Sequence, residues 1–229
     1  GNTVGKFVMG ASWTQTVAPP ASEEDLQLCN ARFEPPLRVL CLHGFMQSAA
    51  SMVAMMQPLT SAMVGQCEFV VPPHSQPWWR ASSLLMPEYR GWEESVDFIR
   101  RFVLANGPFD GVLGFSQGAG LAALLCAMAA SGGSAAAPMA AKFAIMCCGF
   151  RSRDASHAPL FAQEISLPSL HVVGKRDWFL LRHLASNLAQ CFENSELSYH
   201  DGEHELPHDV SVIAAFIRRQ GAIVRSKKK

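Results

Sequence analysis

Short runs of mainly apolar residues alternate with longer segments of helical spacing from residue 37 onward. Such runs, closed by Gly, Pro or His, are typical of strands buried on both faces. We expect strands at residues 37–42, 68–71, 109–115, 143–148, 170–173 and 196–199. We expect helices at residues 52–63, where Pro58 interrupts the pattern, and at 92–105, 117–130, 180–192 and 210–219.

The alternation of strands with helices predicts the fold class. Because the strands are apolar along most of their length, the sheet must be covered on both sides. We therefore expect an α/β protein with a mostly parallel central sheet and helices on both faces. This domain should span residues 37–225, after an N-terminal extension of residues 1–36 with little periodicity and before a basic tail of residues 226–229.

The charge balance narrows the possible partners. The 229 residues include 19 basic and 19 acidic side chains, so the formal net charge is zero. Nucleic-acid binders carry an excess of basic residues, so we expect no nucleic-acid partner. The strongest apolar stretch, residues 121–130, is too short to cross a bilayer, and we expect no integral membrane contact.

The spacing and surroundings of the cysteines indicate whether the chain binds a metal ion and in which redox compartment it lies. The seven cysteines contain no C-x-x-C pair, so a zinc site has no ligand spacing to support it, and we expect neither a metal nor a cofactor. Free thiols buried in apolar runs are typical of a reducing compartment, which predicts a cytoplasmic protein. The cysteines in such runs are Cys41, Cys67, Cys126, Cys147 and Cys148.

The sharpest local signal is Gly114-Phe115-Ser116-Gln117-Gly118, which lies between a predicted buried strand and an apolar helix. This is the context that a nucleophile elbow requires. Glycines are needed because the turn from strand to helix is tight, and the strained serine is lifted clear of the sheet edge. The N-terminus of the following helix directs free N–H groups and its positive dipole end to the same place.

A serine hydroxyl needs a base to take its proton, and the base needs a carboxylate to fix its tautomer. In the α/β-hydrolase order the acid follows the serine and precedes the histidine. Asp177 comes soon after the strand at 170–173, at the sheet edge where catalytic groups gather. A helix-capping role for Asp177 is the alternative, and Asp154 is the second candidate acid.

The base should come from the loop after the last strand. Three histidines lie there, at 200, 204 and 208, but Gly202 and Pro207 break any helix that would align them on a metal. His204 lies in the middle of the loop and is the predicted base. His43 is a further candidate, although its position after the first strand favours a role in bracing that loop.

Two backbone N–H groups are expected to hold an oxyanion. One belongs to Gln117, the residue after the serine, and the other to Phe45, where Gly44 allows a close approach. The apolar side chains of Met46, Trp78 and Trp79 suggest an acyl-binding pocket near this loop. For the two tryptophans, packing in the core is an equally good interpretation.

Taken together, these segments resemble the FSH-type family of serine hydrolases. The resemblance implies an α/β-hydrolase fold and an esterase or thioesterase that acts on acyl chains, with Ser116, Asp177 and His204 as its triad. Glu203 departs from the family pattern, which usually has two glycines before the catalytic histidine. The resemblance rests on residues 42–45 with 47–48, 78–79, 107–111, 114–119, 168–174 with Asp177, and 200–207.

The function expected from the sequence is hydrolysis of carboxylic esters with apolar acyl chains through an acyl-enzyme. One alternative keeps the mechanism and changes the substrate to a thioester on acyl-CoA, on a carrier or on a protein. Another is a binding protein of the same fold without turnover. The expected partner is thus a small-molecule or carrier-bound ester or thioester, and the sequence leaves the acyl length and the oligomeric state open.

Overall fold

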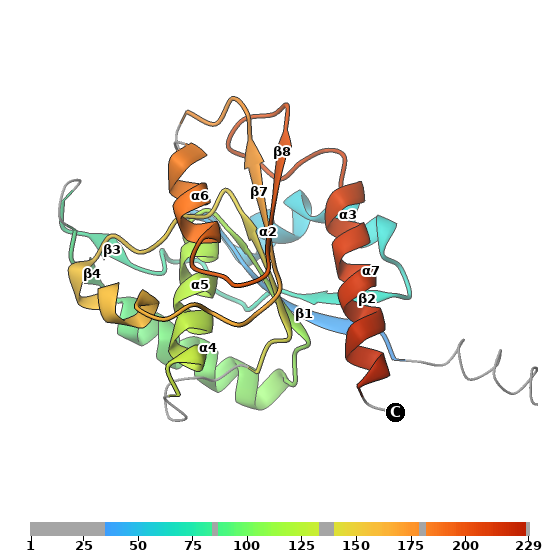
Figure 1. The fold of residues 1–229 in the computed structure, drawn as a ribbon, viewed down its shortest axis with the longest axis horizontal. Helices are drawn as coiled ribbons and strands as arrows, with labels where there is room; N and C mark the ends of the chain where they lie inside the picture. Colours follow the sequence, from blue (N-terminus) through green and yellow to red (C-terminus); the bar gives the residue numbers. More distant parts are fainter. Residues whose placement is uncertain (1–34, 84–86, 133–139, 179–181, 228–229) are drawn as a thin grey trace, which may run out of the picture. The chain divides into compact units, whose positions relative to one another are not determined.

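A parallel sheet of six strands forms the centre of the structure, a computed structural model that describes residues 35–83, 87–132, 140–178 and 182–227 (Figure 1). Its strand order is β2-β1-β5-β6-β7-β8, and every neighbouring pair is parallel. The six expected strands are all present, within two residues of their predicted bounds. They are β1 (Leu37–Leu42), β2 (Cys67–Val70), β5 (Gly111–Phe115), β6 (Phe143–Cys147), β7 (Ser169–Gly174) and β8 (Ser195–His200).

Helices cover both faces of the sheet, and the side chains of β1 show how. Leu40 and Leu42 point into one core with α4 (Trp92–Asn106) and α5 (Gln117–Ala130). Val39 and Cys41 point into the other core, which α2 (Ala49–Met55), α3 (Gln57–Ala62) and α7 (Ser211–Ser226) close. This alternation is the two-residue period of a strand buried on both sides. Helix α6 (Arg182–Ala189) contacts β7 and β8, and its Leu188 belongs to the same core as α4 and α5.

Three helices differ from their predicted bounds by more than one residue. Helix α6 ends at Ala189 rather than at 192, and Phe192 instead forms a β-bridge with Ile165. The segment expected as one helix at 52–63 is two short helices, because Pro58 ends the first and lies in the opening turn of the second. The first of them begins earlier than predicted, at a capping box in which Ser48 and Ser51 bond each other's backbone. Helix α7 continues to Ser226 rather than ending at 219, because Val224 is buried and Gly221 packs on Leu37.

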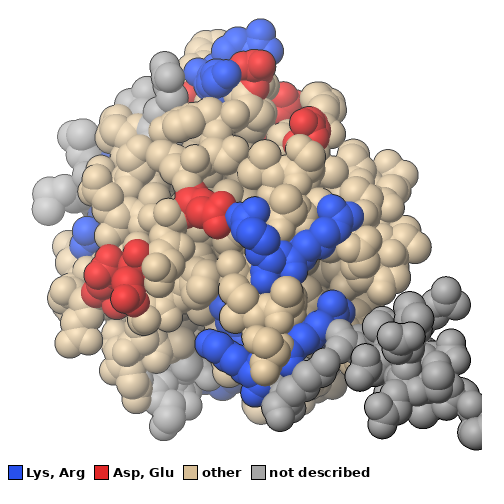
Figure 2. Space-filling view, turned by 45° about the vertical axis from the view of Figure 1, so that its right-hand side comes forward, with Lys and Arg blue, Asp and Glu red and all other residues tan. Residues whose placement is uncertain are grey.

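Charged side chains fasten α7 to its neighbours. Arg219 pairs with Glu196 of β8 at 2.6 Å, and Arg218 donates to the Gln66 side chain at 2.8 Å and to the Ala62 carbonyl at 3.2 Å. Figure 2 views the molecule from this side: basic side chains gather on its lower part, and uncharged atoms make up most of the surface. Arg218 and Arg219 thus bond α7 to the end of α3, to the segment after it and to β8.

Two elements have no counterpart in the sequence prediction. A two-stranded hairpin joins β3 (Arg80–Ala81) to β4 (Tyr89–Arg90), and a 3-10 helix spans Ala155–Phe161. Asp154 explains the second, because its carboxylate accepts the Ser156 N–H at 2.9 Å and the Tyr89 N–H at 2.7 Å. Asp154 is therefore a cap that also ties β4 to this helix.

The expected domain boundaries stay predictions, since residues 1–34 and 228–229 lie outside the described residues. Contacts group Pro36–Lys229 into one compact unit. None of the described helices is long and apolar enough to cross a membrane.

The six cysteines in the described parts of the chain are all free and buried, as expected for those in apolar runs. Burial raises the pKa of Cys126 to about 12 and keeps its thiol protonated.

A buried histidine makes the fold sensitive to acid. His171 lies on β7, where its Nε2 is 3.0 Å from the Ser169 hydroxyl and its ring contacts Phe192. Burial lowers the pKa of His171 to about 4. Between pH 6.5 and about 4 the unfolded chain therefore binds a proton here that the native chain does not, so stability falls as the pH falls through this window.

The substitution His171→Gln should reduce this loss, because an amide keeps a polar partner for Ser169 and does not titrate. We expect the free energy of unfolding, measured in urea from pH 7.5 to 4.5, to fall less steeply with falling pH in this variant than in wild type. The difference in slope should correspond to about one proton fewer taken up on unfolding. The exposed His183 provides a matched control as His183→Gln. Equal slopes for wild type and His171→Gln would contradict the prediction.

Candidate active site

The chain turns sharply at Ser116, between β5 and α5. Ser116 has φ 53° and ψ −117°, a conformation that is strained for any residue with a side chain. A Cβ at Gly114 would lie 2.4 Å from the Ala119 Cα, and one at Gly118 would lie 2.2 Å from the Leu42 carbonyl oxygen. Both positions therefore require glycine so that α5 can pack against the end of β1.

Ser116 heads a chain of two hydrogen bonds. Its Oγ is 2.9 Å from Nε2 of His204, and Nδ1 of His204 is 2.8 Å from Oδ2 of Asp177. The Asp177 side chain is fully buried, whereas the His204 side chain is 22% exposed. The buried carboxylate selects the tautomer with a proton on Nδ1, which leaves Nε2 to accept the serine proton. The structure thus brings together the three residues that the sequence indicates.

Backbone contacts between two loops position the acid and the base. The Lys175 N–H donates to the His200 carbonyl at 2.8 Å, and the Arg176 N–H donates to the Gly202 carbonyl at 3.1 Å. Gly174 allows this approach, because a Cβ there would lie 2.0 Å from the Glu203 carbonyl oxygen. The loops after β7 and β8 are therefore one hydrogen-bonded unit. Glu203 fits into it without a positive φ, so the departure from two glycines does not disturb the loop.

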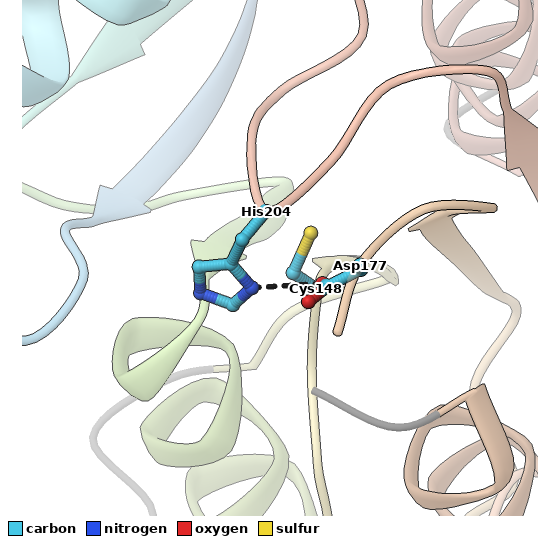
Figure 3. Close-up of side chains that lie close together, drawn as sticks. All are labelled: Cys148, Asp177 and His204. Atoms are coloured by element: carbon cyan, nitrogen blue, oxygen red, sulfur yellow. Dashed lines mark hydrogen bonds and ion pairs between the residues drawn. The ribbon is translucent and has the colours of Figure 1, made fainter. Parts of the chain in front are cut away.

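Cys148 lies next to the acid, a position that the sequence interpretation as a core thiol does not indicate. It follows β6 and has a positive φ of 49°. Figure 3 shows its side chain next to the Asp177 carboxylate, to which the dashed line from the His204 ring runs. The thiol donates to the Glu205 carbonyl oxygen at 3.6 Å, and its sulfur lies within 4.8 Å of a carboxylate oxygen of Asp177. Burial and the charge of Asp177 raise the pKa of Cys148 to about 12, so the thiol is a proton donor.

The same three side chains form the grouping among the described residues that could offer ligands to a metal ion. One ligand atom each from Cys148, Asp177 and His204 lies within 4.8 Å of the others. Nδ1 of His204 is already bonded to Asp177 at 2.8 Å, closer than two ligands of one zinc ion usually lie. The arrangement fits a hydrogen-bond network better than a coordination sphere.

Two backbone donors are available beside the serine. The N–H groups of Phe45 and Gln117 have no hydrogen-bond acceptor within the described parts of the chain. Both residues line a cavity together with Ser116. The turn that carries Phe45 is held by the Gln47 side chain, whose Oε1 accepts the Gly44 N–H at 2.8 Å. The arrangement is compatible with the oxyanion hole expected from the sequence.

The three candidate pocket residues have different surroundings. Trp79 lines the cavity beside Ser116 and is also a buried core residue that stacks on Tyr89, so both interpretations stay open for it. Trp78 is fully buried and stacks on His74 and His43, with its Nε1–H donating to the His43 carbonyl at 2.8 Å. Core packing, the alternative interpretation, therefore describes Trp78. Met46 is 80% exposed with φ 55° and is not among the residues lining the cavities at Ser116.

The other candidates for acid and base lie elsewhere. His43 is buried, with Nδ1 2.9 Å from the Gly44 carbonyl oxygen and Nε2 3.4 Å from the His74 ring, so it braces its own loop as expected. Nδ1 of His200 accepts the Gly202 N–H at 3.2 Å. His208 is exposed. Asp154 is the cap described above, so Asp177 and His204 are the pair within reach of Ser116.

Two cavities meet at Ser116. One, of about 760 Å³, is lined by Trp79, Tyr89 and Phe150 and is called the Trp79 cavity below. The other, of about 460 Å³, is lined by Phe115, His204 and Trp178 and is called the Trp178 cavity. Phe45 and Ser116 border both. A substrate can therefore extend on either side of the serine.

Comparison with known proteins identifies the family to which the chain belongs. A family model described as a serine hydrolase (FSH1) matches residues 73–216. The esterase OVCA2 of Xenopus tropicalis is 33% identical over 201 residues, covering 75% of this chain and 86% of the relative. The esterase C25G4.2 of Caenorhabditis elegans is 34% identical over 213 residues, covering 82% of this chain and 95% of the relative.

Solved structures show the same fold at low identity. The acyl-protein thioesterase 2 of Zea mays has a TM-score of 0.62 at 16% identity and covers 82% of this chain and 94% of its own. SOBER1 of Arabidopsis thaliana has a TM-score of 0.60 at 17% identity, with coverages of 81% and 99%.

The fold and the elbow define the class of protein, which is that of the α/β hydrolases. Within this class, the chain belongs to the FSH1 family of serine hydrolases, and it is an enzyme of the esterase type. The resemblance found in the sequence is thereby confirmed.

Cys148 offers a test of how the acid is held. Cys148→Ala removes the thiol donor, whereas Cys148→Ser keeps a donor on the same positive-φ backbone. We expect kcat on an activated ester to fall about threefold in the alanine variant, with little change in KM, and to recover in the serine variant. The measurement is steady-state kinetics across pH 6 to 9.

If both variants lose activity equally, the side chain of Cys148 matters through packing alone. If neither variant changes kcat, the thiol does not help to position Asp177. Either result would contradict the prediction.

Proposed function

We propose that this chain hydrolyses carboxylic esters of apolar acyl chains through a Ser116–His204–Asp177 triad and an acyl-enzyme. The observation that carries the proposal is the pair of hydrogen bonds, 2.9 Å and 2.8 Å long, that links the strained serine to a buried carboxylate. A hydroxyl, a base and an orienting acid in this order activate a serine for acyl transfer.

The acylation step follows from this geometry. Ser116 Oγ attacks the carbonyl carbon of the ester while His204 Nε2 takes its proton. Asp177 keeps the imidazole oriented and stabilises the imidazolium that forms. His204 then gives the proton to the leaving oxygen, the bond from carbon to that oxygen breaks, and the alcohol departs.

The oxyanion of the tetrahedral intermediate requires donors that are already in place. The free N–H groups of Phe45 and Gln117 are proposed to supply them. One such donor typically contributes about 2.7–4 kcal/mol of transition-state stabilisation. A water molecule, deprotonated by His204, then releases the acid from Ser116 by the reverse sequence.

The position of His204 assigns the two cavities. Because His204 must reach the leaving oxygen, the alcohol belongs on its side, in the Trp178 cavity. The acyl chain then extends into the Trp79 cavity, whose lining includes Trp79, Tyr89 and Phe150. Rings on the wall of a cavity of about 760 Å³ suit an apolar chain better than a charged one.

A thioester is the second candidate substrate. The same triad and acyl cavity would serve an S-acyl group, and one solved protein of this fold is named an acyl-protein thioesterase. Both cavities border Phe45, which is 49% exposed, so a chain carried on coenzyme A, on a carrier or on a protein could enter from outside. Rates on matched oxygen and sulfur esters would separate the two substrates.

Turnover of p-nitrophenyl acyl esters tests the proposal. We expect kcat/KM to rise with chain length until the Trp79 cavity is filled, because each buried methylene contributes about 0.8 kcal/mol. Ser116→Ala should lower kcat by at least about 10³-fold. Trp79→Ala should weaken the preference for long chains, whereas Met46→Ala, on an exposed side chain that lines neither cavity, is the matched control.

Equal turnover by wild type and Ser116→Ala would refute the serine mechanism. A preference that is the same in wild type and Trp79→Ala would refute the assignment of the acyl chain to the Trp79 cavity.

A further inference from the structure

The wall of the Trp178 cavity carries two side chains that neither the fold nor the triad uses. Trp178 is 83% exposed, although it follows the buried Asp177 directly. An indole left in solvent contributes little to folding stability. Glu203 is exposed as well, and its carboxylate has no ion pair or hydrogen bond to another side chain within the described residues.

The surroundings of these two side chains have a definite chemistry. The cavity also presents the rings of Phe45 and Phe115, and Glu203 is the one carboxylate among its described lining residues. Lysine and arginine are missing from that described lining. Aromatic faces beside a single negative charge form the type of site that binds ammonium and quaternary ammonium groups through cation–π and ionic attraction.

The Trp79 cavity, on the acyl side of Ser116, has positively charged lining residues. Arg80 and Arg153 belong to the described lining of the Trp79 cavity, which contains no aspartate or glutamate there. A cationic group would thus be repelled on the acyl side and attracted on the alcohol side. An anionic leaving group, such as the phosphates of coenzyme A, would meet Glu203 next to His204.

We propose that the Trp178 cavity binds the leaving group of the substrate and selects alcohols or thiols that carry a substituted ammonium group. The cation would lie over the Trp178 ring, with Glu203 as its counter-charge. The inference rests on the proposed function, because it assumes acyl transfer to Ser116. In the reaction an aminoalkyl ester and water become the acid and the amino alcohol, and His204 protonates the departing oxygen.

Two esters of equal shape provide the test. Butyrylcholine and 3,3-dimethylbutyl butyrate differ in one atom, a quaternary nitrogen in place of a quaternary carbon, and therefore in charge alone. After correction for their hydroxide-catalysed rates, we expect wild type to prefer the choline ester about tenfold in kcat/KM. The preference should shrink as the salt concentration rises.

Two substitutions test whether Trp178 and Glu203 cause the preference for the choline ester. Trp178→Leu removes the aromatic face and keeps apolar bulk, and Glu203→Gln removes the charge and keeps the shape. Each should reduce the ratio of the two kcat/KM values about threefold or more. Glu94→Gln is the control for Glu203→Gln, because it makes the same change in net charge at an exposed residue of α4 that does not line the Trp178 cavity. It should leave the ratio unchanged.

The outcomes separate this inference from the proposed function. A wild-type ratio near one, or a ratio that neither Trp178→Leu nor Glu203→Gln changes, overturns the ammonium site while ester hydrolysis stands. Hydrolysis of p-nitrophenyl esters but of neither butyrate ester also overturns it. Hydrolysis that Ser116→Ala retains would instead refute the proposed function itself.

Discussion

The close packing of α5 against the carboxyl end of β1 is the contact on which the site depends. It exists because Gly118 has no side chain where the carbonyls of Leu42 and His43 approach, and Gly114 has none where α5 begins. The same contact forces Ser116 into a positive φ and holds it beside the turn that carries Phe45. The packing of the sheet on both sides holds the turn in place, so the backbone strain is confined to Ser116.

A second constraint lies on the other side of the serine. The loops after β7 and β8 bond to each other through Lys175 and Arg176, so Asp177 and His204 belong to one hydrogen-bonded unit. Cys148, at the end of β6, the neighbour of β7, lies next to the Asp177 carboxylate without adding a charge. The three triad residues thus follow the ends of β5, β7 and β8, with β6 between the first two of these strands. The exposed edge of the loops after β7 and β8 carries Trp178 and Glu203, whose proposed role is to select the leaving group.

Much of the fold could be predicted because it follows from local patterns. Runs apolar on both faces predict buried strands, and Pro58 predicts a break in its helix. The motif order also indicates Ser116, Asp177 and His204, which the structure brings together, although their catalytic roles stay a prediction. Three features escaped prediction. The β3–β4 hairpin has two-residue strands, the 3-10 helix at Ala155–Phe161 follows a cap that also bonds Tyr89 far along the chain, and Cys148 meets Asp177 only because β6 and β7 are neighbours.

The central claim is that Ser116 is an activated nucleophile in an intact triad. Intact-mass measurement after treatment with a fluorophosphonate tests it most directly, because such a probe reacts with activated serines and stays attached. An intact triad should give one probe per chain, mapped to Ser116 by peptide analysis, slower labelling in His204→Gln and none in Ser116→Ala. Labelling that persists in Ser116→Ala, or a wild-type chain that does not react, would contradict it.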